Sequence, residues 1–188
     1  PYCYRCPLKL AYPSCKIACI DPIEQILKRR HRELAGFIIE PLMQAAAGMI
    51  PQPAGYLKRV RELCTKYNVL LITDEVATGF GRTGKMFASD YFGIVPDIMT
   101  FGKGISGGFP LAGIMASDRF TGFEAGEDGL TFGQFPVAMA AAIATIDAII
   151  SDDLCNKAHE LGALAAQRLH EMAERRRTIG FIEQVVIP

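Results

Sequence analysis

The sequence predicts an α/β protein in which helices flank a mostly parallel sheet. Short apolar runs typical of buried strands alternate with amphipathic stretches typical of helices, and the joins between them are short. The turns that follow the strand-like runs are rich in Gly, Asp and Lys. With 188 residues, of which 50% are hydrophobic and 21% charged, the chain is long enough to bury a sizeable core and is expected to fold.

The first third of the chain predicts an irregular entry, a helix and a strand. Residues 1–20 are rich in Pro and Cys and are expected to be irregular. Asp21 is expected to cap the helix, Pro22 suits its first turn, and Gly36 ends it. Residues 37–39 form a continuous apolar run, which predicts a strand buried on both faces.

The next elements continue this alternation, and the end of the chain is helical. A second amphipathic helix is expected over residues 56–67, and a buried strand over residues 69–73. Because strand, helix and strand follow one another with short joins, the two strands are expected to pair in parallel. The sequence also predicts strands at residues 98–101 and 111–116 and helices at residues 136–150 and 152–177.

The charge balance gives no reason to expect a nucleic-acid or membrane partner. Lys+Arg and Asp+Glu number 20 each, so the chain has no net charge with which to attract a polyanion or an anionic membrane. The most apolar stretch, residues 136–150, contains Asp147 and is too short to cross a bilayer comfortably. No basic and then apolar leader opens the chain, and we therefore expect a cytoplasmic protein.

Four of the six cysteines lie close together near the start of the chain: Cys3, Cys6, Cys15 and Cys19. A C-x2-C pair followed by a C-x3-C pair can supply four thiolates to a tetrahedral zinc ion. Only eight residues separate the two pairs, and Pro7 and Pro13 interrupt the loop between them. We therefore favour a reduced, partly buried loop and expect no metal.

Two glycine-rich stretches match well-known motifs without the context that those motifs need. Residues 79–85 fit both G-x-G-x-x-G and G-x4-G-K. A Rossmann turn needs its first Gly directly after the strand, but residues 74–78 intervene with two carboxylates, and Met86 stands where a P-loop needs Ser or Thr. Residues 104–108 match the G-x-S-x-G elbow of serine hydrolases, with Ser106 as nucleophile, but a strand rather than a helix is expected beyond them. A serine hydrolase stays an alternative.

Asp74 and Lys103 are the candidates for chemistry. Asp74 ends a fully apolar strand, which predicts a nearly buried carboxylate that requires a partner. Lys103 follows the next strand and is flanked by Gly102 and Gly104, which leave space around its side chain. Ligands bind at the carboxyl ends of the strands in such sheets, so this lysine is positioned to form a Schiff base. An ordinary ion pair between Asp74 and Lys103 explains the spacing equally well.

Four separate segments of the chain form a recognisable series. In sequence order they are the E-P-x-x-Q element that begins at Glu40, residues 74–85 (DEVATGFGRTGK), residues 96–104 (PDIMTFGKG) and the T-F-G turn at residues 131–133. The series closely resembles the class III (omega-type) aminotransferases, which depend on pyridoxal 5'-phosphate (PLP). This resemblance implies part of the PLP-binding large domain of a fold type I transferase over residues 1–150, and the helical start of a C-terminal small domain over residues 151–188.

The resemblance also implies a role for each matched residue. Lys103 would hold PLP covalently and then move a proton between substrate and cofactor, while Asp74 would pair with the protonated pyridine nitrogen. Val76 would pack on one face of the ring, and Thr131 would bind the phosphate, in the family from the neighbouring subunit of a homodimer. Glu40 would lie near the substrate, where it can pair with an arginine.

The implied reaction is transamination between a small amine or amino acid donor and a keto acid or ketone acceptor. The D-E-V-A-T-G version of the motif, with Ala77, is similar to the biotin-pathway branch of the family, the diaminopelargonic acid synthases. Residues 107–112 look more like 4-aminobutyrate or other omega-amino acid aminotransferases. Racemase or mutase chemistry and a non-catalytic fragment also stay open. The family's upstream Gly-Ser phosphate cup and downstream carboxylate-binding arginine have no counterpart, so we expect the middle part of a longer enzyme.

Overall fold

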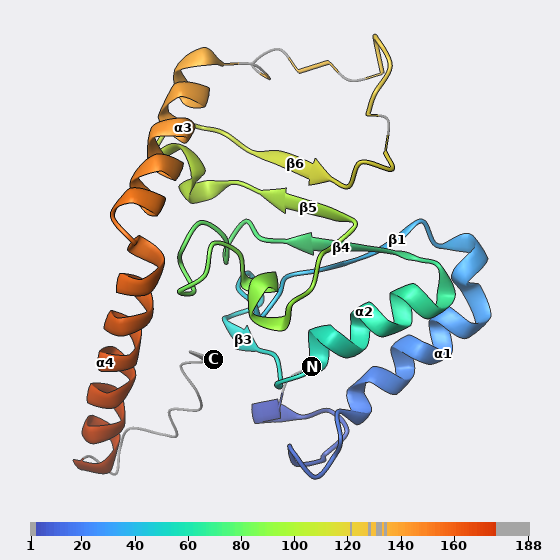
Figure 1. Ribbon diagram of the computed structural model, residues 1–188. Coiled ribbons are helices and arrows are strands. Elements are labelled where there is room, and N and C mark those ends of the chain that lie inside the picture. The colour runs from blue at the N-terminus through green and yellow to red at the C-terminus, as the bar shows by residue number, and fades with distance from the viewer. Residues whose placement is uncertain (1–2, 121, 128, 131–132, 134, 176–188) are drawn as a thin grey trace.

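The computed structural model describes residues 3–120, 122–127, 129–130, 133 and 135–175. A four-stranded sheet forms the centre of the fold, and two helices lie against one of its faces (Figure 1). The strands lie in the order β1 (Gly36–Ile39), β4 (Leu70–Asp74), β5 (Ile98–Phe101) and β6 (Gly113–Ala116).

The sheet is mostly parallel, as predicted. β1 pairs in parallel with β4, and β4 pairs in parallel with β5, whereas β6 runs antiparallel to β5 at one edge. The carboxyl ends of β1, β4 and β5 therefore point to the same end of the sheet. A separate ribbon of β2 (Met43–Gln44) and β3 (Ile50–Pro51) lies in the connection after β1. The sequence analysis predicted no strands there, because two-residue strands are too short to produce an alternating pattern.

Helices α1 (Asp21–Arg30) and α2 (Tyr56–Tyr67) supply many of the buried residues of the hydrophobic core. The apolar residues of α2 recur at helical spacing and form one buried face, which packs on β4 and on α1. Asn68 ends α2 in the left-handed conformation, where its N–H bonds the carbonyls of Cys64 and Thr65. The buried residues of this core are Ile20, Leu27, Ile39, Tyr56, Leu57, Val60, Leu63, Cys64, Val69, Leu71 and Ile94.

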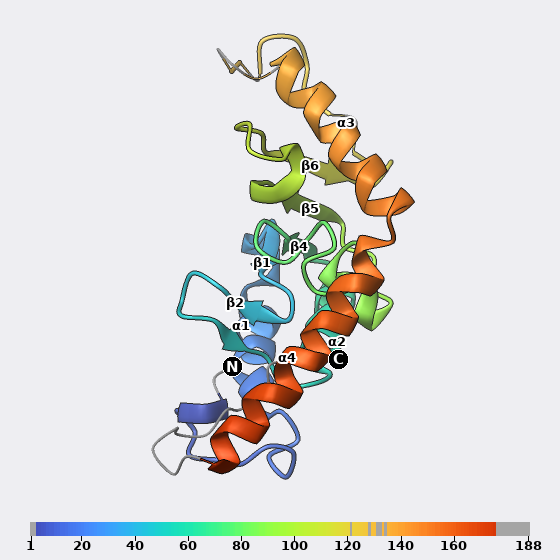
Figure 2. The ribbon, with the colours of Figure 1, turned by 90° about the vertical axis from the view of Figure 1, so that its left-hand side faces the viewer.

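The C-terminal part of the chain is helical, as predicted. α3 (Pro136–Ser151) packs against the short 3-10 helix η5 (Lys103–Ser106), and α4 (Leu154–Arg175) follows it closely. Figure 2 shows the two helices following one another along one side of the molecule. No side chain of α4 is buried among the described residues. The boundary predicted between residues 1–150 and 151–188 stays a prediction, and residues 176–188 lie outside the described part of the chain.

Three local predictions were wrong. Asp21 is the first residue of α1 rather than its cap, because Ile20 occupies the N-cap position and no side chain caps the helix. The α-helix ends at Arg30, earlier than predicted, since a 3-10 turn, η3 (His31–Glu33), takes over. Ile38 is 62% exposed, so β1 is not buried on both faces by the residues described. The other short 3-10 helices are η1 (Cys3–Arg5), η2 (Ala18–Ile20) and η4 (Ala88–Phe92).

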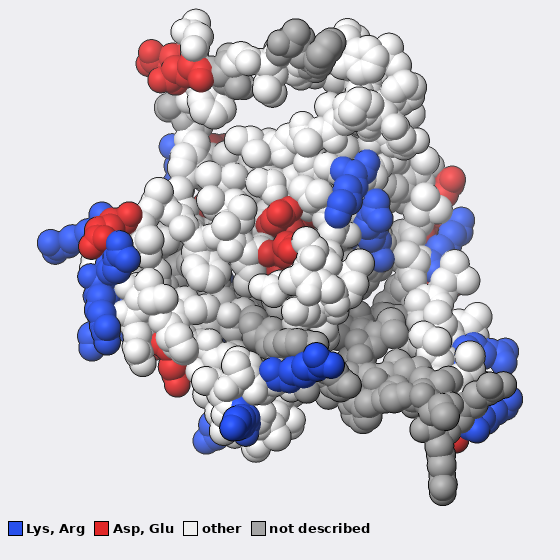
Figure 3. Space-filling view, turned by 180° about the vertical axis from the view of Figure 1, so that it is seen from behind, with Lys and Arg blue, Asp and Glu red and all other residues white. Residues whose placement is uncertain are grey.

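Charged side chains are spread over the surface. On the face in Figure 3, basic groups gather at the left edge beside acidic ones, and further basic groups lie at other places on the surface. Within the described residues, no helix is both long and apolar enough to cross a membrane.

Asp97 joins three parts of the fold at the amino end of β5. Its Oδ2 accepts hydrogen bonds from the Leu71 N–H at 2.7 Å and from Arg61 Nη1 at 2.9 Å, and its Oδ1 accepts one from Arg119 Nη2 at 2.5 Å. Burial by itself would raise the pKa of the Asp97 carboxyl, but the Leu71 N–H and the two guanidinium groups hold this pKa below its ordinary value. The ionised carboxylate therefore stabilises the fold.

Replacing Asp97 with asparagine is expected to lower the free energy of unfolding by about 2 kcal/mol near neutral pH. A carboxyl whose pKa is lowered by folding stabilises the fold above its unfolded pKa of about 3.9, and this contribution is lost as the pH falls through the lower folded pKa. Urea denaturation of both proteins at about pH 7 and about pH 3 measures the difference, which is expected to shrink at the lower pH. Asp118→Asn, at an exposed position, is the control. An equal loss at both pH values would contradict the ionic explanation.

Candidate active site

Three of the predicted site residues lie at the carboxyl end of the parallel strands. Glu40 directly follows β1, Asp74 is the last residue of β4, and Lys103 follows β5 after Gly102. The strand register pairs Ile39 with Thr73 and Asp74 with Thr100, so the three strands reach this end side by side. Because parallel strands end at the same edge, the fold brings together three residues that lie far apart in the sequence.

Asp74 is half-buried, and its carboxylate has an oxygen to spare. Oδ1 accepts a hydrogen bond from the Val76 N–H at 3.0 Å, which holds the side chain in place. Among the described residues, Oδ2 accepts no hydrogen bond and Asp74 forms no ion pair with Lys103. The carboxylate is therefore less buried than the sequence predicted, and the interpretation as an ordinary ion pair is wrong for this structure.

Lys103 has an exposed side chain on a strained backbone. Its φ is 49°, in the left-handed region that residues other than glycine rarely adopt, and it begins η5. Such conformations cost of order 1–3 kcal/mol and cluster at functional sites, where the surrounding structure holds them in place. Val76 lies beside this turn, since a Cβ on Gly102 would be 3.7 Å from Val76 Cγ1. Arg82 lies on its other side, with Nη2 at 3.0 Å from a Cβ placed on Gly104.

Glu40 is held by the connection that follows it. Its Oε2 accepts a hydrogen bond from the Ala45 N–H at 2.9 Å, and its backbone carbonyl accepts one from Gln52 Nε2 at 2.6 Å. The side chain is partly buried and forms no ion pair within the described residues. Thr131, the residue predicted to bind the phosphate, lies outside the described residues.

These residues fit the pyridine end of PLP. A half-buried carboxylate with a spare oxygen suits a protonated ring nitrogen, and an amine without an ion pair suits covalent attachment. Val76 supplies an apolar contact. Gly102 and Gly104 keep the turn around Lys103 open, because a Cβ at Gly102 would approach Val76 and a Cβ at Gly104 would approach Arg82. The donor set therefore agrees with the cofactor that the sequence implies.

Sequence reasoning missed two residues next to this site, Glu75 and Arg82. Glu75 is fully buried between the two residues assigned to the ring, and it forms four hydrogen bonds. Two acidic residues in a row after a buried strand were the available signal, because a second carboxylate at a strand end also needs partners. The position of Arg82 over Gly104 depends on the shape of the loop, which no sequence period reveals.

The competing motifs do not have the geometry that they need. Residues 79–85 form a series of turns that leads to the short 3-10 helix η4, whereas a Rossmann turn or a P-loop opens an α-helix. Ser106 is fully buried, and its hydroxyl donates a hydrogen bond to the Phe109 carbonyl. A hydrolase elbow exposes its serine, so this arrangement excludes Ser106 as the nucleophile.

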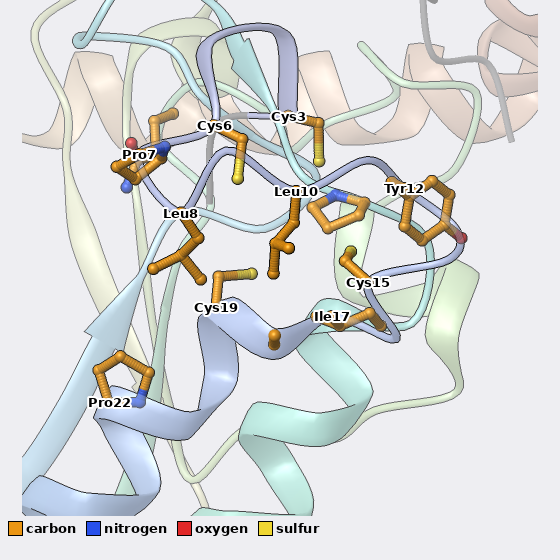
Figure 4. A pocket seen from close by; sticks show the side chains of 13 residues that line it. Cys3, Cys6, Pro7, Leu8, Leu10, Tyr12, Cys15, Ile17, Cys19 and Pro22 are labelled. Carbon is orange, nitrogen blue, oxygen red and sulfur yellow. The ribbon is translucent and has the colours of Figure 1, made fainter.

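The four N-terminal cysteines line one cavity of about 330 Å³ (Figure 4). All four thiols are free; Cys3 is exposed and the others are partly buried. Burial raises the pKa of the Cys3 and Cys19 thiols, and neighbouring thiols of the group raise the Cys3 value further. No three His, Cys, Asp or Glu side chains gather to hold a metal ion within the described residues.

Known proteins are similar to this chain in sequence and in fold. Residues 3–185 match the family Aminotransferase class-III. The chain is 44% identical over 184 residues to the adenosylmethionine-8-amino-7-oxononanoate aminotransferase of Geobacter sulfurreducens, covering 93% of this chain. It is 43% identical over 157 residues to the mitochondrial ornithine aminotransferase of Arabidopsis thaliana, covering 82% of this chain. It spans 41% and 33% of the lengths of these two relatives.

The fold is similar to that of solved transaminases. An amine transaminase from an uncultivated Pseudomonas species, in its PLP-bound form, matches with a TM-score of 0.87 and 36% identity, over 97% of this chain and 44% of that chain. The predicted architecture, a mostly parallel sheet with helices as in the fold type I transferases, is confirmed.

Proposed function

Because the chain belongs to the class III aminotransferase family, we propose that it is the part of a PLP-dependent aminotransferase that holds the cofactor ring. PLP is the cofactor that this family implies. The observation that carries the proposal is the meeting of Asp74 and Lys103 at one end of the sheet. Both side chains there have polar atoms without a partner among the described residues.

In this proposal each residue has one task. When bound, PLP supplies an electron sink for the negative charge that develops beside the transferred amino group. Asp74, whose Oδ1 is held by the Val76 N–H, offers Oδ2 to the protonated pyridine nitrogen. Lys103 Nζ would anchor the cofactor; once the substrate amine has replaced it there, the freed amine would take a proton from the substrate carbon and deliver it to the cofactor carbon. Val76 covers one face of the ring, and Glu40 lies on the substrate side.

The proposed substrates are a small amine or amino acid donor and a keto acid or ketone acceptor. The biotin-pathway reaction of the diaminopelargonic acid synthases is the first choice, because the Geobacter relative, an adenosylmethionine-8-amino-7-oxononanoate aminotransferase, bears the other name of that enzyme and aligns with nearly the whole chain. The Arabidopsis relative supports an omega-amino acid donor as the alternative. Offering S-adenosylmethionine and an omega-amino acid in parallel, each with a keto acceptor, separates the two. A racemase or mutase would exchange no nitrogen between carbon skeletons with either donor.

The proposed assembly is a homodimer with the site at its subunit interface. Supporting this, α3 leaves large apolar side chains in contact with solvent: Val137 is 50% exposed, Ile143 63% and Ile150 65%. Exposed apolar patches of this kind mark interaction surfaces, and in this proposal a second subunit covers this one. Thr131 as a phosphate ligand and the domain boundary after residue 150 belong to the same proposal. The cytoplasmic location stays a prediction.

Borohydride reduction tests the proposed cofactor chemistry. After incubation of the protein with PLP, reduction is expected to attach the cofactor covalently to Lys103, because Asp74 and Val76 at the same end of the sheet would hold the cofactor ring beside this amine. Peptide mapping by mass spectrometry identifies the labelled residue. Lys58, exposed on α2, is the internal control and is expected to stay unlabelled at equimolar PLP. Label on surface lysines with none on Lys103 would overturn the proposal.

A further inference from the structure

Glu75 is a fully buried acidic residue directly beside the proposed cofactor site. It follows Asp74 and precedes Val76, the two residues proposed to contact the cofactor ring, and its exposed fraction is 0%. Burying a carboxylate is costly unless hydrogen bonds replace its water. Glu75 forms no ion pair within the described residues, so neutral donors have to supply those hydrogen bonds.

Four donors converge on the two carboxylate oxygens. Oε2 accepts hydrogen bonds from Thr78 Oγ1 at 2.5 Å and from the Ala88 N–H at 3.0 Å. Oε1 accepts hydrogen bonds from the Ser89 N–H at 2.9 Å and from Ser89 Oγ at 2.8 Å. Ala88 and Ser89 are the first residues of η4, so the carboxylate ties the end of β4 to a segment that begins 13 residues later.

This connection closes the glycine-rich loop between β4 and η4 onto the site. Within the loop, Phe80 stacks edge-on against Phe87 and against Phe101, with ring centroids 5.5 Å and 5.9 Å apart. Phe101 is the last residue of β5 and lies two residues before Lys103. On the backbone, the Glu75 N–H donates to the Thr100 carbonyl at 2.9 Å, which extends the pairing of β4 with β5 beyond Asp74. Glu75 thus links the strand that bears Asp74 to the strand that leads to Lys103.

The donor pattern requires a carboxylate rather than an amide. Each oxygen accepts one backbone N–H, from Ala88 or from Ser89. A hydroxyl can reverse its role and accept, but a backbone N–H can only donate. In a glutamine at this position, one of the two backbone N–H groups would face the amide NH2 whichever way the amide turned. The network therefore tolerates glutamate and rejects its closest isostere.

We propose that Glu75 is a positioning residue for the cofactor site: its buried carboxylate fixes Asp74 and Val76 on one side against the ring and keeps them aligned with Lys103 on the neighbouring strand. This inference rests on the proposed function. It assigns a role to a residue that touches neither the ring nor the substrate, and it explains why a fully buried carboxylate stands between the two residues that do.

Glu75→Gln in the PLP-loaded protein tests the inference, with Asp97→Asn as the matched control. Both changes remove a carboxylate that anchors backbone N–H groups, but Asp97 lies at the amino end of β5, away from the site. Glu75→Gln is expected to shift the absorbance maximum of the bound cofactor, and the pH at which that absorbance changes. It is also expected to lower kcat by between about 10-fold and 100-fold with little change in KM, because small misplacements of reacting groups have effects of this size. Asp97→Asn is expected to lower the melting temperature and leave the absorbance spectrum as it is.

The outcomes distinguish a positioning role of the Glu75 carboxylate from a purely structural one. If Glu75→Gln lowers the melting temperature as Asp97→Asn does but leaves spectrum and kcat unchanged, the carboxylate is only structural and the inference is wrong. If Glu75→Gln does not fold, Ser89→Ala removes one donor to Oε1 and is expected to shift the spectrum in the same direction by a smaller amount. No shift in that variant would also refute the inference. Failure of the proposed function is a separate result, since unaltered protein would then attach no cofactor to Lys103.

Discussion

Transaminase activity is expected to fall by at least about 1,000-fold when Lys103 is replaced by alanine. The substitution removes both the covalent anchor of the cofactor and the base that moves the proton, and no other lysine lies within two residues of the end of a parallel strand of the described sheet. The side chain is exposed and forms no ion pair with the described residues, so the fold is expected to lose less than about 1 kcal/mol. Initial rates with an amine donor and a keto acid, together with thermal unfolding, measure the two effects.

Lys58→Ala is the matched control for this experiment, because Lys58 is exposed on α2 and lies in no part of the proposed site. Small primary amines added to the Lys103→Ala protein are expected to restore part of the rate, since they can replace the missing base. Retention of more than about a tenth of the activity by Lys103→Ala would contradict the role assigned to this residue.

Replacing Asp74 with asparagine is expected to lower kcat by about 100-fold or more. The amide keeps the length of the side chain and can still accept the Val76 N–H through Oδ1, so the local structure is expected to survive. What is lost is the negative charge that keeps the pyridine nitrogen protonated, and with it the capacity of the ring to accept electrons. Steady-state kinetics and the absorbance spectrum of the bound cofactor measure this loss.

The control for Asp74 is Asp118→Asn, at an exposed position after β6, which removes the same charge without touching the site. Equal rates for Asp74→Asn and the unaltered protein would show that Asp74 does not engage the ring nitrogen. A variant that has lost kcat and has also unfolded would be detected by its circular dichroism spectrum.

The elements with strong patterns could be predicted from the sequence. The apolar run around residue 38 and the one at residues 69–73 predicted parallel strands, and their carboxyl ends do lie together, because parallel pairing leaves no other arrangement. The apolar period of α2 and its end at Asn68 were likewise predictable, since both depend on residues close in sequence. The motif around Asp74 and the motif around Lys103 carried the family assignment.

Other features were beyond local reasoning. The cap expected at Asp21 failed because the preceding 3-10 helix η2 already occupies the N-cap position. The exposure of Ile38 depends on which segments cover the second face of the sheet, which an apolar run alone does not state. The hydrogen bonds of Glu75 reach residues 13 and 14 positions away, through backbone groups that carry no sequence signal.

The sequence by itself determined the family, the strand and helix series and the identities of Asp74 and Lys103, because these depend on side-chain type and short-range spacing. Only the tertiary structure decided that these two residues form no ion pair, that Lys103 adopts a left-handed backbone, and that the buried Glu75 carboxylate accepts four hydrogen bonds just beyond β4. The reason is that partners of a buried or strained group are chosen by folding across loops. The spacing of an acidic and a basic residue along the chain does not reveal whether the two side chains form an ion pair or lie apart with room for a cofactor between them.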